Sequence, residues 1–228
     1  MDNKLSIITV NFNTPEYIFA LNHSLRKYNT WYKQPIIVYD NSITKELKEI
    51  KTEQLDIRYV DNAIYKDIDS LPKSKYAVAG NYNSARHAKT IDMMLNNIST
   101  PYCLLVDSDI IFKMDFKKIV DDFITNNYFL MGYRRTTYKK PCIAPWCCFI
   151  NIKQYTNKKL SFFDFNRILY INDNLDYDTG ASLYEDAISN GLQIKETQDN
   201  TFYTHFKGGS VFKNKGILWL KQNLNIWF

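Results

Sequence analysis

Hydrophobic residues in the first half of the chain fall into short continuous runs that alternate with stretches of helical spacing. The runs lie at residues 5–10, 35–39, 57–60 and 101–106, and the helical stretches at 16–28, 45–51 and 83–97. Runs without in-and-out alternation are typical of strands covered on both faces, as in a parallel sheet. The pattern therefore predicts one α/β domain, a three-layer sandwich around a mostly parallel central sheet.

In such a sheet the ligand crevice lies beyond the carboxyl ends of the strands. The three loops that follow predicted strands there are residues 11–14, 40–42 and 107–109, and each is rich in polar residues. We therefore expect the functional site to be built on these loops.

The second half of the chain carries fewer clear elements. Residues 179–189 have helical character and end at Asn190-Gly191, and residues 200–203 resemble a strand. The short amphipathic tail, residues 216–228, is expected to form a helix that caps the core, with contact to a membrane surface as the alternative.

Composition narrows the class of protein. With 228 residues, 45% hydrophobic and 23% charged, the chain suits an ordinary globular fold. The net charge of +5 suits anionic ligands such as diphosphates, but no concentrated basic face indicates a nucleic-acid binder. The pairs Arg134-Arg135 and Lys139-Lys140 are interpreted as a solvated face.

Cysteine content and hydropathy suggest the compartment. The four cysteines contain no CxxC pair, so neither a disulfide framework nor a zinc knuckle is expected. No run approaches the ~20 apolar residues of a membrane helix, and no signal peptide is recognisable at the first apolar run. These features predict a cytoplasmic protein without a transmembrane segment.

An Asp-x-Asp pattern occurs three times, at Asp67/Asp69, Asp107/Asp109 and Asp176/Asp178. Only Asp107-Ser108-Asp109 directly follows a buried strand, and apolar residues 110–112 come after it. Two carboxylates in such surroundings are unfavourable unless a cation neutralises them. Mg²⁺ or Mn²⁺ would do so and could bridge the phosphates of a diphosphate ligand. The alternative is a solvated turn.

Four segments in order carry a family resemblance. They are residues 6–13, 36–42, 84–95 and 100–112, with the sequences SIITVNFN, IIVYDNS, SARHAKTIDMML and TPYCLLVDSDIIF. Together they resemble the GT-A glycosyltransferases, in particular the family-two-like group, over residues 4–112 and more loosely to about 212. The resemblance implies a donor-binding half at 1–112 and an acceptor-binding, catalytic half at 113–228.

The resemblance also implies a nucleotide site in the first half. Asn11 and Phe12 lie in the turn that meets the base, where Phe12 would stack on it. Asp40 would accept the N3–H of uracil or thymine, because an acceptor cannot pair with the unprotonated N3 of cytosine. The alternatives are core packing for Phe12 and helix capping for Asp40.

Further donor contacts follow from the same resemblance. They would come from the ribose- and phosphate-facing residues Asn83, Arg86 and His87, from Ser108 inside the metal motif, and from Lys207. Arg86 suits a diphosphate through its planar charged fork. His205 would be the third protein ligand of the metal, and Gly208-Gly209 would let the segment around Lys207 move.

The catalytic base and the acceptor platform are expected in the second half. Asp178 precedes a predicted helix, as does the acidic segment that supplies the base in inverting members of the family. Asp176, Glu185 and Asp186 are alternatives, and a plain helix N-cap is the other interpretation of Asp178. Trp146 could stack on a sugar face or be an ordinary buried Trp.

The sequence therefore predicts an enzyme that moves a sugar from a nucleotide sugar, with UDP favoured, to a hydroxyl of a glycan or other acceptor. Inversion and a Mn²⁺ or Mg²⁺ cofactor are expected. A nucleotidyltransferase of related fold is one alternative, although residues 11–15 lack the glycines of its phosphate loop. A catalytically silent sugar-binding protein is the other.

Overall fold

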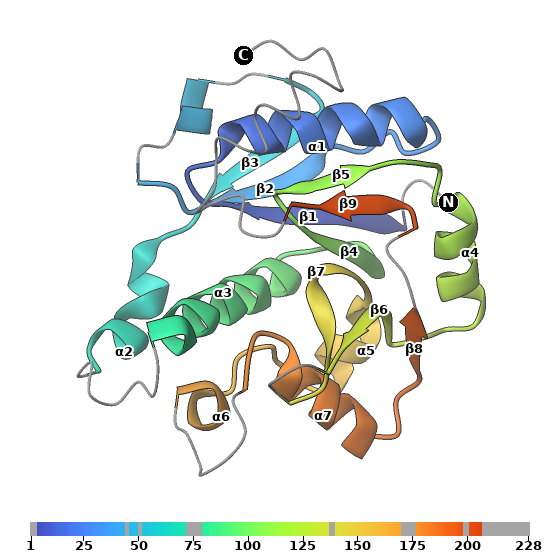
Figure 1. Ribbon diagram of the computed structural model, residues 1–228. Helices are drawn as coiled ribbons and strands as arrows, with labels where there is room; N and C mark the ends of the chain where they lie inside the picture. Colours follow the sequence, from blue (N-terminus) through green and yellow to red (C-terminus); the bar gives the residue numbers. More distant parts are fainter. Residues whose placement is uncertain are drawn as a thin grey trace.

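A seven-stranded sheet with the order β3-β2-β1-β4-β7-β6-β8 forms the centre of the molecule (Figure 1). The structure is a computed structural model that describes residues 4–43, 46–49, 52–71, 79–136, 140–169, 177–197 and 201–206. The strands are β1 (Leu5–Asn11), β2 (Ile36–Asp40), β3 (Leu55–Tyr59), β4 (Tyr102–Asp107), β6 (Leu130–Arg135), β7 (Cys142–Asn151) and β8 (Ile194–Thr197).

The first four strands pair in parallel, as the continuous apolar runs predict. β1 pairs with β2 and β4, and β2 pairs with β3. β7 then runs antiparallel to β4 and β6, while β8 is parallel to β6. Four of these six pairings are parallel, which confirms a mostly parallel sheet in one α/β domain.

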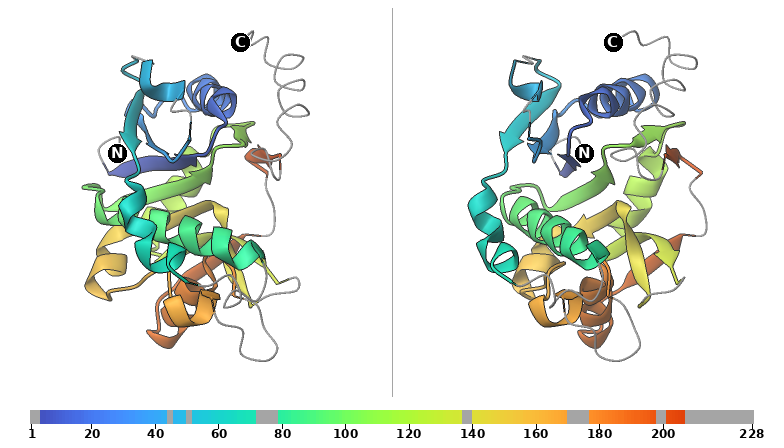
Figure 2. Two further views of the ribbon diagram at one scale, coloured as in Figure 1. Left: turned by 90° about the vertical axis from the view of Figure 1, so that its left-hand side faces the viewer. Right: turned by 60° about the vertical axis from the view of Figure 1, so that its left-hand side comes forward.

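Helices cover both faces of the sheet (Figure 2). One hydrophobic cluster joins α1 (Pro15–Tyr28), the 3₁₀ turn η1 (Glu46–Glu49) and α4 (Lys117–Thr125) to one face. The other cluster joins η2 (Asn62–Tyr65), α2 (Lys66–Asp69), α3 (Ala79–Asn96), α5 (Ile152–Asn157), α6 (Phe165–Leu169) and α7 (Ala181–Ser189) to the opposite face. The predicted three-layer sandwich is confirmed.

A separate two-stranded ribbon of β5 (Ile110–Phe112) and β9 (Tyr203–His205) lies on the α1 side of the sheet. Phe112 and Phe202 are buried in the same cluster as α1 and α4. β5 follows β4 after a short turn, so its pairing with β9 places the last described residues beside the carboxyl end of β4 (Figure 1).

Two elements differ from the sequence prediction. The helix expected at 45–51 is a single 3₁₀ turn, Glu46–Glu49, in its described part, and 3₁₀ helices occur mostly as such short pieces. The strand expected at 200–203 is displaced to Tyr203–His205, where pairing with β5 sets its limits. Residues 216–228 lie outside the described residues.

None of the described helices combines the length and the apolar content that a membrane crossing requires. The four cysteines are buried as free thiols.

Candidate active site

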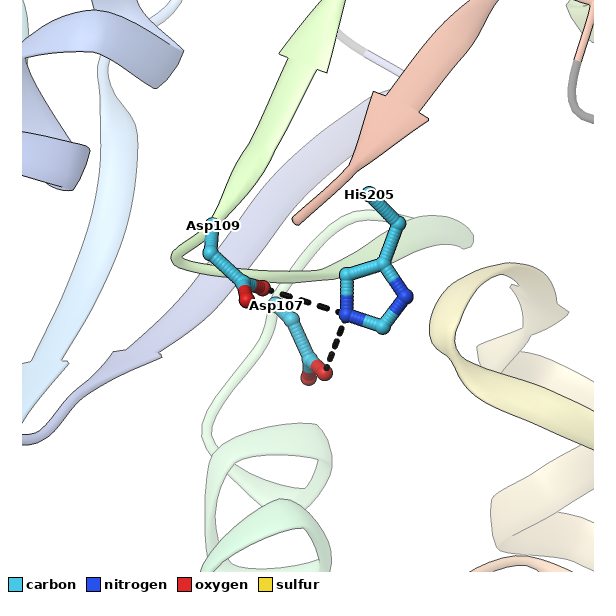
Figure 3. Close-up of side chains that lie close together, drawn as sticks. All are labelled: Asp107, Asp109 and His205. Carbon is cyan, nitrogen blue, oxygen red and sulfur yellow. Dashed lines mark ion pairs between the residues drawn. The ribbon is translucent and has the colours of Figure 1, made fainter. Parts of the chain in front are cut away.

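Three side chains converge at the edge where β4 ends (Figure 3). Asp107 is the last residue of β4, Asp109 directly precedes β5, and His205 is the last residue of β9. The antiparallel pairing places His205 opposite Ile110, and the Phe206 backbone N–H donates to the Asp109 carbonyl at 3.2 Å. The β5–β9 pairing therefore places His205 beside the Asp107/Asp109 pair, almost 100 residues earlier in the chain.

The His205 imidazole faces both carboxylates. Its Nε2 lies 3.2 Å from Asp109 Oδ1 and 3.7 Å from Asp107 Oδ2. The Asp109 and His205 side chains are 7% and 9% exposed, whereas that of Asp107 is 31% exposed. Asp107 is thus the member of the triad that borders solvent.

Crowding of the two acids affects their protonation. Burial raises the pKa of the Asp107 carboxyl, and the neighbouring Asp109 raises it further, while His87 and His205 act in the opposite direction. A divalent cation would relieve the repulsion between the two carboxylates. Binding of a cation between Asp107 and Asp109 would therefore stabilise the charged form of both carboxylates.

The ligand atoms of these three residues fit one metal ion. One atom from each lies within 4.8 Å of the others, and no other such group occurs among the described residues. Two carboxylates suit Mg²⁺ or Mn²⁺, and the imidazole nitrogen is a common ligand of transition metals such as Mn²⁺. The triad would hold a divalent cation at the carboxyl end of β4.

An aromatic and a cationic side chain extend the site beyond the triad. The Trp146 ring stacks on the His205 ring, with centroids 5.2 Å apart and an interplanar angle of 25°. The Arg135 guanidinium lies 5.8 Å from the Trp146 ring centroid. Trp146, which is partly buried on β7, thus lies between His205 and the ion pair that Arg135 forms with Asp178.

Asp178 is the acidic member of that ion pair. Its Oδ2 accepts from Arg135 Nη2 at 2.7 Å, and its Oδ1 accepts from Ser84 Oγ at 2.6 Å and from the Thr179 backbone N–H at 2.8 Å. Ser84 is one helical turn before His87 on α3, and such pairs are neighbours on a helix surface. His87 lies close enough to Asp107 to lower its pKa. Asp107 and Asp178 therefore lie near the same stretch of α3.

The alternative bases are less suitably placed. Glu185 contacts Tyr177 at 2.7 Å and Lys140 at 3.2 Å, and Asp186 pairs with Arg167 at 2.7 Å. These contacts link α7 to surrounding surface segments. Asp176 lies outside the described residues.

The carboxyl ends of β1, β2 and β3 lie side by side next to that of β4. In the parallel register, Asn11 is beside Asp40 and Asp40 is beside Tyr59. Phe12 is 46% exposed, Tyr59 41% and Ile43 82%. The Ile43 N–H donates to Asn13 Oδ1 at 3.1 Å, which ties the loop after β2 to the loop after β1. Exposed apolar side chains at a polar edge could contact a flat ligand.

Asp40 itself is 1% exposed. Its Oδ1 accepts from Asn11 Nδ2 at 3.0 Å and from the Ser42 backbone N–H at 3.1 Å. Its Oδ2 is buried with no hydrogen-bond partner among the described residues. Asn11 is equally buried, and its side chain links the end of β1 to Asp40, Ser42 and Thr14 inside the protein.

The remaining predicted donor residues are spread along α3 and the metal motif. Asn83 is exposed, and His87 is partly buried near Asp107. The Ser108 Oγ lies 3.2 Å from Thr14 Oγ1, which links the metal motif to the loop after β1. Lys207 lies outside the described residues.

Arg86 has a set of contacts that its sequence does not reveal. Its Nη1 lies 3.0 Å from Asp69 Oδ1 and 2.7 Å from the Tyr82 hydroxyl, and the guanidinium is 4.0 Å from the Tyr65 ring centroid. Lys89 pairs with Asp67 in the same way. The Asp67/Asp69 pair is thus matched by cations of α3, and a diphosphate contact for Arg86 stays a prediction.

Sequence reasoning misses Arg135. The interpretation of Arg134-Arg135 as a solvated face is right for Arg134 but wrong for Arg135, whose side chain is only 21% exposed. Adjacent residues of a strand point to opposite faces, so a pair of arginines on a strand cannot both share one environment. That alternation is the signal that could have separated them.

Comparison with known proteins supports the fold. No family model matches the sequence, and no curated protein matches it significantly. Among solved structures, S. aureus TarS has a TM-score of 0.54 at 15% identity, covering 98% of this chain and 40% of that chain. A TarS fragment of residues 1–349 has been solved in complex with UDP. The present chain spans less than half the length of TarS.

Two further structures are similar to the chain. The mannosyltransferase PcManGT from Pyrobaculum calidifontis, in complex with GDP-Man and Mn²⁺, has a TM-score of 0.50 at 10% identity, covering 86% of this chain and 55% of that chain. A putative glucose-1-phosphate thymidylyltransferase from Bacillus anthracis has a TM-score of 0.54 at 8% identity, covering 98% and 97%. At these identities the likeness establishes the GT-A fold, and both transferase classes share it.

Proposed function

We propose that the protein is a metal-dependent glycosyltransferase that moves a sugar from a nucleoside-diphosphate sugar to a hydroxyl acceptor, with inversion. The observation that carries the proposal is the convergence of Asp107, Asp109 and His205 at the carboxyl edge of β4. Ligands of α/β sheets bind at this edge. The fold shared with TarS and PcManGT is consistent with a nucleotide-sugar donor.

The donor would lie along the edge from β2 to β4. Phe12 offers an exposed face for the base. A UDP-sugar is favoured because the family resemblance assigns the imide N–H of the base to Asp40, whose Oδ2 is buried here and would have to become accessible on binding. The diphosphate would reach the triad, where a bound Mn²⁺ or Mg²⁺ would neutralise charge on the departing nucleoside diphosphate. Ser108, Asn83, His87, Arg86 and Lys207 are proposed as further donor contacts.

Asp178 is proposed as the base that removes the proton of the acceptor hydroxyl. Its Oδ2 faces Arg135, and its Oδ1 faces Ser84 and the Thr179 N–H. Trp146 is partly exposed between Asp178 and the triad, where a sugar ring could stack on it. The acceptor would thus be held opposite the departing diphosphate, as an inverting displacement requires.

A binding experiment tests the metal and nucleotide claims. Isothermal titration of UDP should give metal-dependent binding in the wild-type protein and none in Asp109→Asn. Asp67→Asn is the matched control, because it changes the same residue type in an Asp-x-Asp pair and its partner Lys89 is not among the proposed donor contacts. If the wild-type protein bound no nucleoside diphosphate in the presence of Mn²⁺, the proposal would be abandoned.

A nucleotidyltransferase is the second candidate, because the thymidylyltransferase matches nearly its full length and that of this chain. The two reactions release different products. A transferase incubated with a UDP-sugar and Mn²⁺ should release UDP as the sugar passes to water or to an added acceptor. A nucleotidyltransferase supplied with the same UDP-sugar and pyrophosphate should instead release UTP and the sugar 1-phosphate. Binding without either product would indicate a catalytically silent protein of the same fold.

A further inference from the structure

The strands that hold Asp109 and His205 in place, β5 and β9, are each three residues long. Among the described residues they pair only with each other and not with the seven-stranded sheet. A two-stranded ribbon is at most marginally stable by itself. The relative position of Asp109 and His205 must therefore be set by the side chains that pack on this ribbon.

The two faces of the ribbon are packed differently. One face packs into the large hydrophobic cluster around α1 and α4, through Ile110, Phe112, Phe202 and Tyr203. Ile111 points to the opposite face, because side chains alternate along a strand. There it packs with Tyr17 and Ala20 in a small separate cluster. The second face of the ribbon is therefore packed against the first half of α1.

Tyr17 touches both sides of the ribbon on this second face. Its side chain is fully buried, and the centroid of its ring lies 5.8 Å from that of Phe206, at an interplanar angle of 49°. Phe206 directly follows His205 in the chain. Ile111, the other neighbour of Tyr17, lies two residues after Asp109. Tyr17 therefore packs against the chain next to two of the three metal ligands.

The Tyr17 hydroxyl lies near Asp109 without a bond of its own. Burial raises the pKa of this hydroxyl, and the carboxylates of Asp109 and Glu16 raise it further, so the group stays protonated and uncharged. It has no hydrogen-bond partner among the described residues. The side chain thus acts on the ribbon through the packing of its ring.

We propose that Tyr17 is a positioning residue of the metal site, and that its ring fixes β5 against β9 so that Asp109 and His205 face the same cation. The inference rests on the proposed function, in which the triad binds Mn²⁺ or Mg²⁺, and adds the residue that sets the spacing of two ligands. Residues that orient metal ligands typically contribute about 10-fold to 100-fold to metal affinity. Metal affinity, and not stability alone, should therefore depend on Tyr17.

Isothermal titration of Mn²⁺ into the folded protein tests this role. We expect Tyr17→Leu to weaken Mn²⁺ binding by at least about 10-fold, because leucine lacks the ring that reaches Phe206. Tyr17→Phe keeps the ring and loses only the unpartnered hydroxyl, so it should bind Mn²⁺ as tightly as the wild-type protein.

Phe206→Leu approaches the same contact from the other strand. It should weaken Mn²⁺ binding to a similar extent, and the double variant with Tyr17→Leu should lose little more than the larger single change, because both substitutions remove one shared contact. Phe206 is only partly buried, so this variant keeps the test available if Tyr17→Leu does not fold.

Phe129→Leu is the matched control for stability. Phe129 is fully buried in the hydrophobic cluster on the opposite face of the sheet, so this change also removes a buried ring. Thermal unfolding should show a lower Tm in both Tyr17→Leu and Phe129→Leu, whereas Mn²⁺ affinity should fall only in Tyr17→Leu.

The results separate the inference from the function on which it rests. Wild-type Mn²⁺ affinity in folded Tyr17→Leu or Phe206→Leu would overturn the inference. An equal loss of affinity in Tyr17→Phe and Tyr17→Leu would overturn it as well, because ring packing would then not be the cause. A wild-type protein that binds no Mn²⁺ would instead refute the proposed function.

Discussion

The guanidinium of Arg135 lies 2.7 Å from the Asp178 carboxylate and 5.8 Å from the centroid of the Trp146 ring. Since Trp146 stacks on His205, this ion pair is connected by direct contacts to the metal triad. The two side chains are 21% and 17% exposed, so the pair is better shielded than most surface ion pairs. Arg135 can therefore orient Asp178. The pair leaves two roles to separate, Asp178 as the base or Asp178 as a residue that positions Arg135.

Substituting each member of the pair separates these roles. If Asp178 is the base, Asp178→Asn should lower kcat by about 100-fold to 10,000-fold with little change in donor KM. Arg135→Gln should cost less, about 10-fold, because the carboxylate remains and Ser84 still donates to it. Steady-state kinetics with a UDP-sugar measures both. Equal losses in the two variants would mean that Asp178 acts only by holding Arg135.

Metal binding should depend on pH through Asp107. Its raised pKa means that the metal-free protein keeps more protons on this carboxyl than the unfolded chain does, so its contribution to stability falls as pH rises above the ordinary aspartate range. Mn²⁺ requires the charged form. The gain in Tm on adding Mn²⁺ should therefore be small at acidic pH, where Asp107 is protonated, and should grow toward neutral pH.

At a Mn²⁺ concentration of about 100 times its Kd, binding should add about 2.7 kcal/mol to the free energy of unfolding. This corresponds to a rise in Tm of roughly 5–10 °C for a domain of this size. Asp107→Asn should abolish the gain and, without metal at neutral pH, should be more stable than the wild-type protein. Differential scanning calorimetry at several pH values measures both effects. A Mn²⁺-induced shift that stays constant from acidic to neutral pH would contradict the assignment.

Phe12→Ala should weaken UDP binding by about 1–3 kcal/mol, which is the usual contribution of one base stacked on one aromatic ring. The Phe12 side chain is 46% exposed, so its removal should leave Tm almost unchanged. Phe12→Tyr keeps the ring and is the matched control. Titration with UDP gives the affinities, and a large fall in Tm without loss of affinity would identify Phe12 as a core residue.

Gly132→Ala should destabilise the fold by about 1–3 kcal/mol through overpacking. A Cβ at Gly132 would lie 2.7 Å from Ile143 Cγ2 and 3.0 Å from the Cys147 carbonyl oxygen, where β6 crosses an irregularity in its pairing with β7. The backbone contact cannot move aside easily. Gly191→Ala is a useful contrast for packing alone, because its added Cβ would meet no atom within 4 Å, although the φ of 65° adds strain. Denaturant unfolding compares the two variants.

The local pattern of residues determined the first half of the fold. Continuous apolar runs predicted β1, β2 and β4, and the polar residues after them predicted the loops of the crevice. These elements could be predicted because a strand that is buried on both faces needs consecutive apolar residues, which are visible in the sequence. The position of Asp107 and Asp109 at a strand end followed from the same runs, and so did the expectation of a cation between them.

The relations between distant segments were decided by tertiary structure. The sequence indicated His205 only through a family resemblance, and the β5–β9 pairing brought it to 3.2 Å from Asp109. Strand alternation places Arg134 and Arg135 on opposite faces, but the sequence could not show that Arg135 is the one that faces Asp178. Nor could it show that the Asn11 side chain is bonded to Asp40 inside the protein. Side-chain direction and strand register depend on long-range packing, which short patterns of residues do not encode.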